Sequence, residues 1–180
     1  MNTSSTVGAK PAVAVIAPVA IDAQMLGPGL RYWYFANQIS RQQPVTLLTP
    51  NTDPPKSAAF NVQPYQERGA LAHVLGSHPV VIIQGYPLFF IPTLRDLLRA
   101  ADNAVVVDLY TPLNLEGLEI IKNGPAAHKW NGININVLLE QMQLGDFFIC
   151  ASERQRDYYL GMLAAAGRIN PHTYHGDPTG

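Results

Sequence analysis

One carboxylate stands where an α/β protein commonly binds its ligand. Asp108 directly follows the β-branched run Val105–Val107, so it falls at the carboxyl end of a predicted strand. Ligands of doubly wound sheets bind outside the carboxyl ends of the strands. A carboxylate at that point could act as a base or bind the hydroxyl groups of a ligand. The alternative is structural, because Asp in such turns often accepts hydrogen bonds from the next N–H groups, here those of Tyr110 and Thr111.

A second candidate is the turn between the first predicted strand and the helix that follows it. Gly27 and Gly29 flank Pro28, and a backbone with so little side chain can closely approach a phosphate or a sugar. The third glycine of a dinucleotide fingerprint is missing, so a simple tight turn is an equal alternative. Arg31 in the first helical turn could meet an anionic group or be an ordinary solvated charge.

Polar residues after two further predicted strands complete the set. Gln84 and Tyr86 follow the most apolar run and could hydrogen-bond or stack against a sugar, or simply form a strand-ending turn with a surface tyrosine. Ser152 precedes a helical pattern that has Gln155 at the capping-box position, which explains Ser152 structurally. The predicted site consists of Asp108 as the catalytic candidate and of Gly27, Gly29, Arg31, Gln84, Tyr86, Tyr110, Ser152 and Glu153 as substrate-binding residues.

Composition excludes several classes of function. A formal net charge of −1 over 180 residues gives no basic surface for nucleic acid. The five histidines and the single cysteine, Cys150, lack the spacing of a metal site, so we expect no metal, no cofactor and no disulfide. A polar start without a signal peptide predicts a cytoplasmic protein. No run approaches the ~20 apolar residues of a membrane helix, which leaves only peripheral membrane contact open.

Short apolar runs alternate with helical patterns along the whole chain. This alternation predicts an α/β fold: a single Rossmann-like, doubly wound parallel sheet with helices on both faces. The predicted strands are 12–17, 45–49, 60–65, 80–84, 104–108 and 146–150, and helices are predicted at 30–42, 69–75, around 94–98, 117–121, 133–144 and after Ser152. One domain should span residues 11–168, between a flexible segment at 1–10 and a tail or linker at 169–180.

Three stretches carry a family resemblance. GPGLRYWYFANQIS (27–40), VVVDLYTPLNLEGLE (105–119) and CASERQRDYYLGML (150–163) resemble the amino-terminal half of a two-Rossmann-domain (GT-B) glycosyltransferase of family four. The resemblance runs from about Ala12 to Asp177. It implies the acceptor-side domain of a retaining enzyme that transfers a sugar from a nucleotide-sugar to a hydroxyl acceptor. It also implies that the isolated chain is inactive, because a separate domain or subunit would bind the donor.

Two classes of function therefore stand together at this point. One is the glycosyltransferase half, with a donor-binding domain or subunit and a saccharide or other hydroxyl acceptor as partners. The other is a non-catalytic Rossmann-like module that binds a saccharide or another subunit. In both cases a cleft face is expected to remain exposed and to drive self-association. The residues predicted for that face are Leu26, Tyr86, Tyr110 and Leu113.

Overall fold

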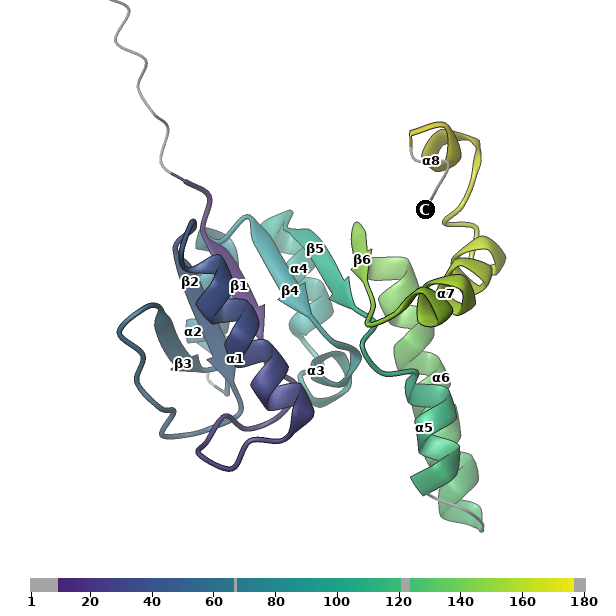
Figure 1. The fold of residues 1–180 in the computed structure, drawn as a ribbon, viewed down its shortest axis with the longest axis horizontal. Coiled ribbons are helices and arrows are strands. Elements are labelled where there is room, and N and C mark those ends of the chain that lie inside the picture. Colours follow the sequence, from purple (N-terminus) through teal and green to yellow (C-terminus); the bar gives the residue numbers. More distant parts are fainter. Residues whose placement is uncertain (1–9, 67, 121–123, 177–180) are drawn as a thin grey trace, which may run out of the picture. The chain divides into compact units, whose positions relative to one another are not determined.

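The structure is a computed structural model that describes residues 10–66, 68–120 and 124–176 (Figure 1). Six strands form one parallel sheet in the order β3-β2-β1-β4-β5-β6, which confirms the predicted Rossmann-like α/β fold. The strands are β1 (Val13–Ile16), β2 (Val45–Thr49), β3 (Asn61–Pro64), β4 (Val80–Ile83), β5 (Ala104–Asp108) and β6 (Phe147–Ile149). The helices are α1 (Gly27–Ile39), α2 (Arg68–Ser77), α3 (Gly85–Phe90), α4 (Leu94–Ala101), α5 (Leu113–Ile120), α6 (Pro125–Leu144), α7 (Glu153–Ala165) and α8 (Pro171–Gly176).

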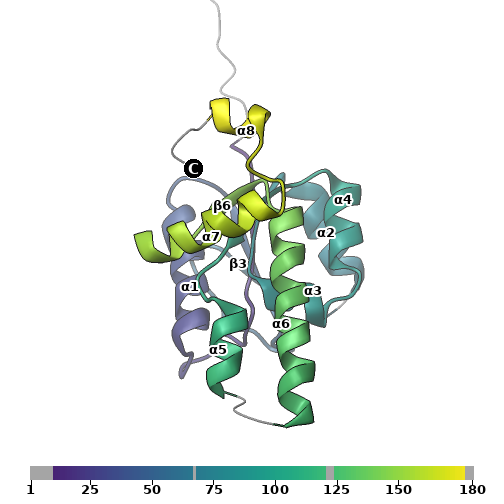
Figure 2. The same cartoon turned by 90° about the vertical axis from the view of Figure 1, so that its right-hand side faces the viewer.

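The chain divides into two compact units, and the first ends at Val81. In this unit β2 pairs in parallel with β1 on one side and with β3 on the other. Every residue of β1 and of β2 is buried, as expected for strands covered on both faces. Figures 1 and 2 show α1 and α2 on opposite faces of these strands. Pro64 lies in the outermost strand, where a missing N–H is tolerated.

The second unit begins at Ile82 and contains the carboxyl-terminal strands. β5 and β6 pair in parallel, with Val107 opposite Phe148. A side-chain bond extends this pairing, because Val105 N donates to Asp146 Oδ2 at 2.8 Å. Arg168, just after α7, donates from Nη2 to the carbonyl oxygen of Gly145 at 2.6 Å and so ties the end of α7 to the end of α6. These contacts fix the start of β6 between two helices.

Several helix boundaries differ from those predicted. Residues 27–29 were expected in a loop but form the first turn of α1, because Pro28 at a helix start loses no hydrogen bond. The turn predicted after Gln84 is instead the short helix α3. Residues 171–176, expected in a tail or linker, form α8. The strand predictions and the capped start of α7 at Ser152 are confirmed.

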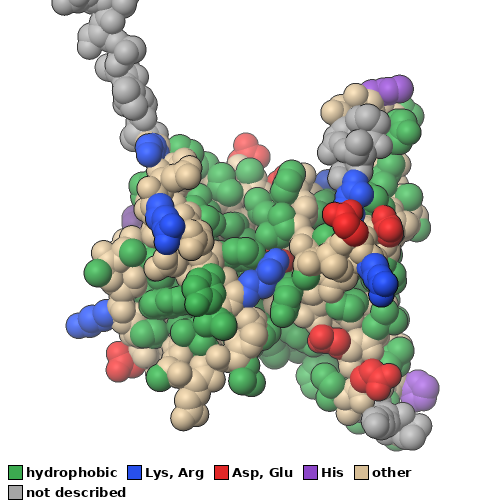
Figure 3. Space-filling model, viewed as in Figure 1, with side chains coloured by type: hydrophobic (Ala, Val, Ile, Leu, Met, Phe, Trp, Pro, Cys, Tyr) green, Lys and Arg blue, Asp and Glu red, His purple; other side chains and the backbone are tan. Residues whose placement is uncertain are grey.

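The surface of the second unit carries exposed hydrophobic side chains. They concentrate on α5 and α6, and Figure 3 shows hydrophobic and acidic side chains side by side over these two helices. None of the helices in the described ranges combines the length and the apolar character needed to cross a bilayer.

Candidate functional site

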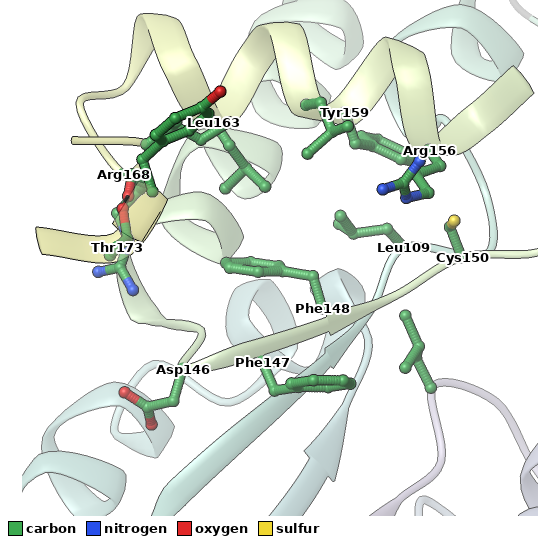
Figure 4. A pocket seen from close by; sticks show the side chains of 14 residues that line it. Leu109, Asp146, Phe147, Phe148, Cys150, Arg156, Tyr159, Leu163, Arg168 and Thr173 are labelled. Carbon is green, nitrogen blue, oxygen red and sulfur yellow. Dashed lines mark hydrogen bonds between the residues drawn. The ribbon is translucent and has the colours of Figure 1, made fainter. Parts of the chain in front are cut away.

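A hollow in the second unit lies between the edge strand β6 and the two last helices. It has a volume of about 520 Å³, within the range of small-molecule sites. Its floor is β6 with its flanks, Asp146–Cys150, and its walls come from α7 and from the segment Arg168–Tyr174 that contains the start of α8. We call this space the β6–α7 hollow. Figure 4 shows Phe148 rising from β6 toward Leu163 of α7.

Apolar and aromatic groups make up most of this lining. Leu109, Tyr159 and Leu163 are buried, whereas Phe148 and Leu160 are partly exposed. Aromatic rings and branched chains offer a ligand large apolar contacts with little loss of side-chain freedom. The hollow is therefore suited to an apolar body rather than to a hydrated polar ligand.

Two arginines give the ends of the β6–α7 hollow a positive charge. Figure 4 shows Arg156 and Arg168 at opposite ends of the lining. Arg156 Nη1 lies 3.6 Å from a carboxylate oxygen of Glu153, whose side chain is exposed. Arg168 is held by backbone carbonyls, and Asp146 in the same lining accepts from Val105 N. With two guanidinium groups and one carboxylate, the lining favours an anionic group at a ligand's end.

Tyr159 supplies the most buried polar group of the lining. Its side chain is 2% exposed, and its hydroxyl has no hydrogen-bond partner among the described residues. Burial is the main cause that raises the pKa of Tyr159 well above that of a free tyrosine, and the neighbouring acidic groups of Tyr158, Cys150, Asp108 and Glu116 raise it further. The hydroxyl therefore stays protonated at every physiological pH. It can donate a hydrogen bond, but it cannot serve as a base.

Asp108 lies at the carboxyl end of β5, as the sequence predicted. Its side chain is fully buried, and the adjoining Leu109 rather than Asp108 lines the β6–α7 hollow. The following loop is fastened to α7, because Gln155 Nε2 donates to the carbonyl oxygen of Tyr110 at 3.0 Å. A direct chemical role for Asp108 and a ligand contact for Tyr110 both stay predictions.

Ser152 and Glu153 make structural contacts at the start of α7. Gln155 N donates to Ser152 Oγ at 3.3 Å, and Gln155 Oε1 accepts from Ala151 N at 2.8 Å. This exchange confirms the predicted capping role of Ser152. Glu153 pairs with Arg156 one helical turn later, so it influences one end of the hollow through that arginine.

Gln84 and Tyr86 belong to the start of α3. Gln84 is the residue before the helix and is buried, which leaves its side chain little access to a surface ligand. Tyr86 is partly exposed, its ring centroid lies 6.1 Å from that of Phe90, and burial followed by the charge of Glu116 raises its pKa. Sugar contacts by these two residues stay predictions.

The glycine turn and Arg31 lie in the first unit. An added Cβ on Gly29 would lie 3.1 Å from Met25 Cβ and 3.2 Å from the carbonyl oxygen of Ala20, so close packing alone accounts for this glycine. The Arg31 guanidinium lies over the ring of Phe35, 4.7 Å from its centroid. That these residues share a crevice with Asp108 stays a prediction, as does any ligand contact of Gly27.

The predicted cleft face needs one correction. Leu113 was expected to be exposed, but only 2% of it is accessible because it begins α5 with its side chain packed inward. Leu26 is exposed, and Tyr86 and Tyr110 are partly exposed. Among the described residues, no three His, Cys, Asp or Glu side chains are arranged to hold a metal ion.

The residues of the β6–α7 hollow were missed by the sequence analysis. Residues 169–180 were expected to be a tail or a linker, so no wall opposite β6 was expected. One signal was present: Pro171 follows Asn170, a good helix cap, and Asn170 Oδ1 accepts from His172 N at 3.0 Å. That signal predicts a further helix, which is the element that closes the hollow.

Comparisons with known proteins correct the functional interpretation. No family model and no curated protein matches this chain. A similar solved structure is a wide-type short-chain dehydrogenase/reductase from Veillonella parvula DSM 2008, crystallised in complex with NADP. The TM-score is 0.47 and the identity 12%, over 78% of this chain and 67% of that chain.

The glycosyltransferase interpretation is therefore wrong. The resembling stretches were short, no family model matches the chain, and the solved structure named above belongs to a different class of protein. The expectations that depended on that interpretation are withdrawn with it. They are the sugar transfer, the nucleotide-sugar donor and the inactivity of the isolated chain as half of an enzyme. The likeness itself is too distant to carry a dehydrogenase activity or a cofactor to this chain.

Proposed function

We propose that this chain is a ligand-binding module whose β6–α7 hollow takes an amphipathic organic anion, a molecule with an apolar body and an acidic end. The observation that carries the proposal is an apolar hollow of about 520 Å³ with an arginine at each end. Concave apolar sites with a few convergent polar groups are the usual form of small-molecule sites.

Each part of such a ligand finds a matching group in the lining. The apolar body would lie against Phe148, Leu160 and Leu163, where transfer from water contributes roughly 25 cal/mol per Å² of buried apolar area. The acidic end would meet Arg156 or Arg168 in a charge-assisted hydrogen bond. The unpartnered hydroxyl of Tyr159 would gain an acceptor if the ligand carries one within reach.

Three polar groups of the lining, those of Tyr159, Arg168 and Asp146, are suited to binding a ligand. The hydroxyl of Tyr159 is held protonated by its raised pKa, and Arg168 is engaged with the carbonyl oxygens of Gly145 and Gln143. The carboxylate of Asp146 is engaged with Val105 N. These groups can orient a ligand and neutralise its charge, which is recognition rather than bond making.

A fluorescent organic anion tests this proposal directly. Anilinonaphthalene sulfonate has an aromatic body and one sulfonate, and we expect it to bind the chain with enhanced fluorescence. The variant Leu160→Trp should fill the hollow and weaken binding by at least about tenfold, the effect of losing roughly 1.4 kcal/mol of contact. The affinity is measured by fluorescence titration.

Ala164→Trp is the matched control for that variant. Ala164 lies on the same helix, is exposed, and does not line the hollow, so the added indole should leave the titration unchanged. Equal affinities for wild type, Leu160→Trp and Ala164→Trp would remove the hollow as the binding site.

The charge of the hollow has its own test in Arg156→Gln. This variant should weaken binding of anilinonaphthalene sulfonate by about threefold to tenfold, because a partly exposed charge contributes on the order of 1 kcal/mol. Binding of N-phenylnaphthylamine, which has the same rings without the sulfonate, should stay unchanged. A parallel loss of both dyes would mean that Arg156 shapes the hollow and does not pair with the anion.

A further inference from the structure

An exposed seam runs along α6, separate from the β6–α7 hollow. His128, Gly132, Ile135 and Leu139 are all exposed and follow one another at spacings of four, three and four residues. At 100° per residue these positions form one stripe, and this spacing is that of helices that pack against another helix in a coiled coil. We call these four residues the α6 seam.

The other side of α6 is already occupied. Asn134, Val137, Leu138, Gln141 and Met142 are buried. At 100° per residue Val137 and Gln141 lie far from the α6 seam and Leu138 lies on its flank, whereas Met142 continues the seam and marks the point where it becomes buried. Close packing against α5 is visible at Gly117, where an added Cβ would collide with the side-chain amide of Asn134. Figures 1 and 2 show α5 and α6 side by side. One face of α6 is therefore packed against the rest of the unit, and the α6 seam is a second face that has no packing partner among the described residues.

Exposed apolar side chains recur along this pair of helices. Ile135 is 41% and Leu139 43% exposed, and on α5 Leu115 is 48% and Leu118 52% exposed. Such clustered exposed leucine and isoleucine side chains mark an interaction surface. Gly132 lies at the middle of the α6 seam with no atom within 4 Å of an added Cβ, so another helix could approach closely there.

The charges of the two helices point to a second copy of this chain as the occupant. α5 carries Glu116 and Glu119 and no basic residue, whereas the first half of α6 carries His128 and Lys129 and no acidic residue. The acidic residue farther along α6, Glu140, is paired with Arg95 of α4. A surface with an acidic helix beside a basic helix start is complementary to itself after a two-fold rotation.

We propose that the chain forms a two-fold dimer in which the α6 seams of two copies pack together and each α5 flanks the partner's α6. The apolar residues of the seam form the centre of this interface, and Glu116 and Glu119 of one copy lie near Lys129 of the other. The α6 seam spans residues 128–139, about 17 Å of helix at 1.5 Å per residue, so α5 has to contribute the remaining area of an interface of standard size.

Sedimentation equilibrium of the full chain tests the dimer. Wild type should be a dimer, and Ile135→Asp should raise the dissociation constant by about a hundredfold, because a charge is buried at the centre of the interface. Leu26→Asp is the matched control. Leu26 is the exposed residue directly before α1, and it belongs to the cleft face predicted from the sequence. Its substitution should leave the dimer intact. A monomeric wild type, or a dimer broken by Leu26→Asp and not by Ile135→Asp, overturns the proposal.

Charge reversal gives an independent readout of the arrangement. The double variant Glu116→Lys with Glu119→Lys should weaken the dimer by about tenfold, and adding Lys129→Glu should restore part of the loss. Loss without any restoration would contradict the pairing of α5 with the partner's α6. Flotation with vesicles of phosphatidylcholine and phosphatidylserine tests a membrane as the alternative partner of this apolar surface. A monomeric chain that floats with these vesicles would overturn the dimer.

Discussion

Gly145→Ala should lower the free energy of unfolding by about 2 kcal/mol or more, the scale of overpacking in a closely packed site. An added Cβ at Gly145 would lie 2.6 Å from Phe148 Cε1 and 2.8 Å from Val107 Cγ2. The backbone at Gly145 has φ −68° and ψ 136°, which alanine adopts without strain, so the expected loss comes from packing alone. Urea denaturation followed by circular dichroism measures it.

Gly161→Ala is the matched control for Gly145→Ala. Gly161 lies inside α7, is exposed, and has no atom within 4 Å of an added Cβ. Alanine is the better helix former, so this variant should raise the free energy of unfolding by up to about 1 kcal/mol. Gly145→Ala should also displace the Phe148 ring and weaken dye binding, whereas Gly161→Ala should leave the dye affinity unchanged. Equal stabilities of the two variants would show that β6 and α6 are not packed as described.

Alkaline pH should destabilise the protein through two buried tyrosines. Burial raises the pKa of Tyr65 from 10.0 to about 12, and burial also raises that of Tyr159. Below about pH 10 these tyrosines are neutral in both the folded and the unfolded protein, and their contribution to the free energy of unfolding is fully present. This contribution is lost as the pH rises through the pKa values that the tyrosines have in the folded protein. By about pH 12 Tyr65 alone should cost about 2 kcal/mol, since one pKa unit corresponds to about 1.4 kcal/mol.

Phenylalanine variants isolate these two groups from the other titrating residues. Tyr65→Phe and Tyr159→Phe should each reduce the loss of stability between neutral pH and about pH 12, measured as the free energy of unfolding in urea. The exposed Tyr34 provides the control, because Tyr34→Phe should leave the alkaline loss as in wild type. Tyr159→Phe should not lower stability at neutral pH, since its hydroxyl has no hydrogen-bond partner among the described residues. An alkaline loss that is the same in all three variants would contradict the burial of these hydroxyls.

The strands of this protein were predictable because their signal is local. Continuous runs of β-branched and small apolar residues form two of these strands, Val13–Ile16 and Ala104–Asp108. Such runs are typical of parallel strands that are covered on both faces. The start of α7 was predictable for a similar reason, because a serine cap and a glutamine three residues later form a local hydrogen-bond pattern. Gln155 N donates to Ser152 Oγ, and Gln155 Oε1 accepts from Ala151 N. Asp108 was correctly placed at the end of its strand on the same basis.

The helix starts that contain glycine and proline were not predictable in the same way. Gly27-Pro28-Gly29 and Gly85-Tyr86-Pro87 are typical of turns, yet both begin helices, because a proline in the first helical turn loses no hydrogen bond and the local pattern therefore fits a turn and a helix start equally well. Gly29 is explained by its contact with the preceding loop, which is a tertiary fact that no local pattern contains.

Apart from the helix start at Asn170 and Pro171, the candidate site could not be predicted from local patterns. The β6–α7 hollow exists because Arg168 fastens the end of α7 to Gly145 and because α8 supplies a wall from a segment that looked like a tail. Its lining mixes residues that are individually ordinary, such as Leu163 in a helix and Phe148 in a strand. Only their assembly creates an apolar space with charged ends.

The place where an organic anion binds this chain can be measured directly. Isotope-filtered nuclear Overhauser spectra of the ¹³C-labelled chain with anilinonaphthalene sulfonate report which side chains lie within about 5 Å of the dye, the distance scale of apolar contact. Binding in the β6–α7 hollow predicts contacts to Phe148, Leu160 and Leu163. Contacts confined to Leu115, Leu118 and Ile135 on the exposed helices would contradict it.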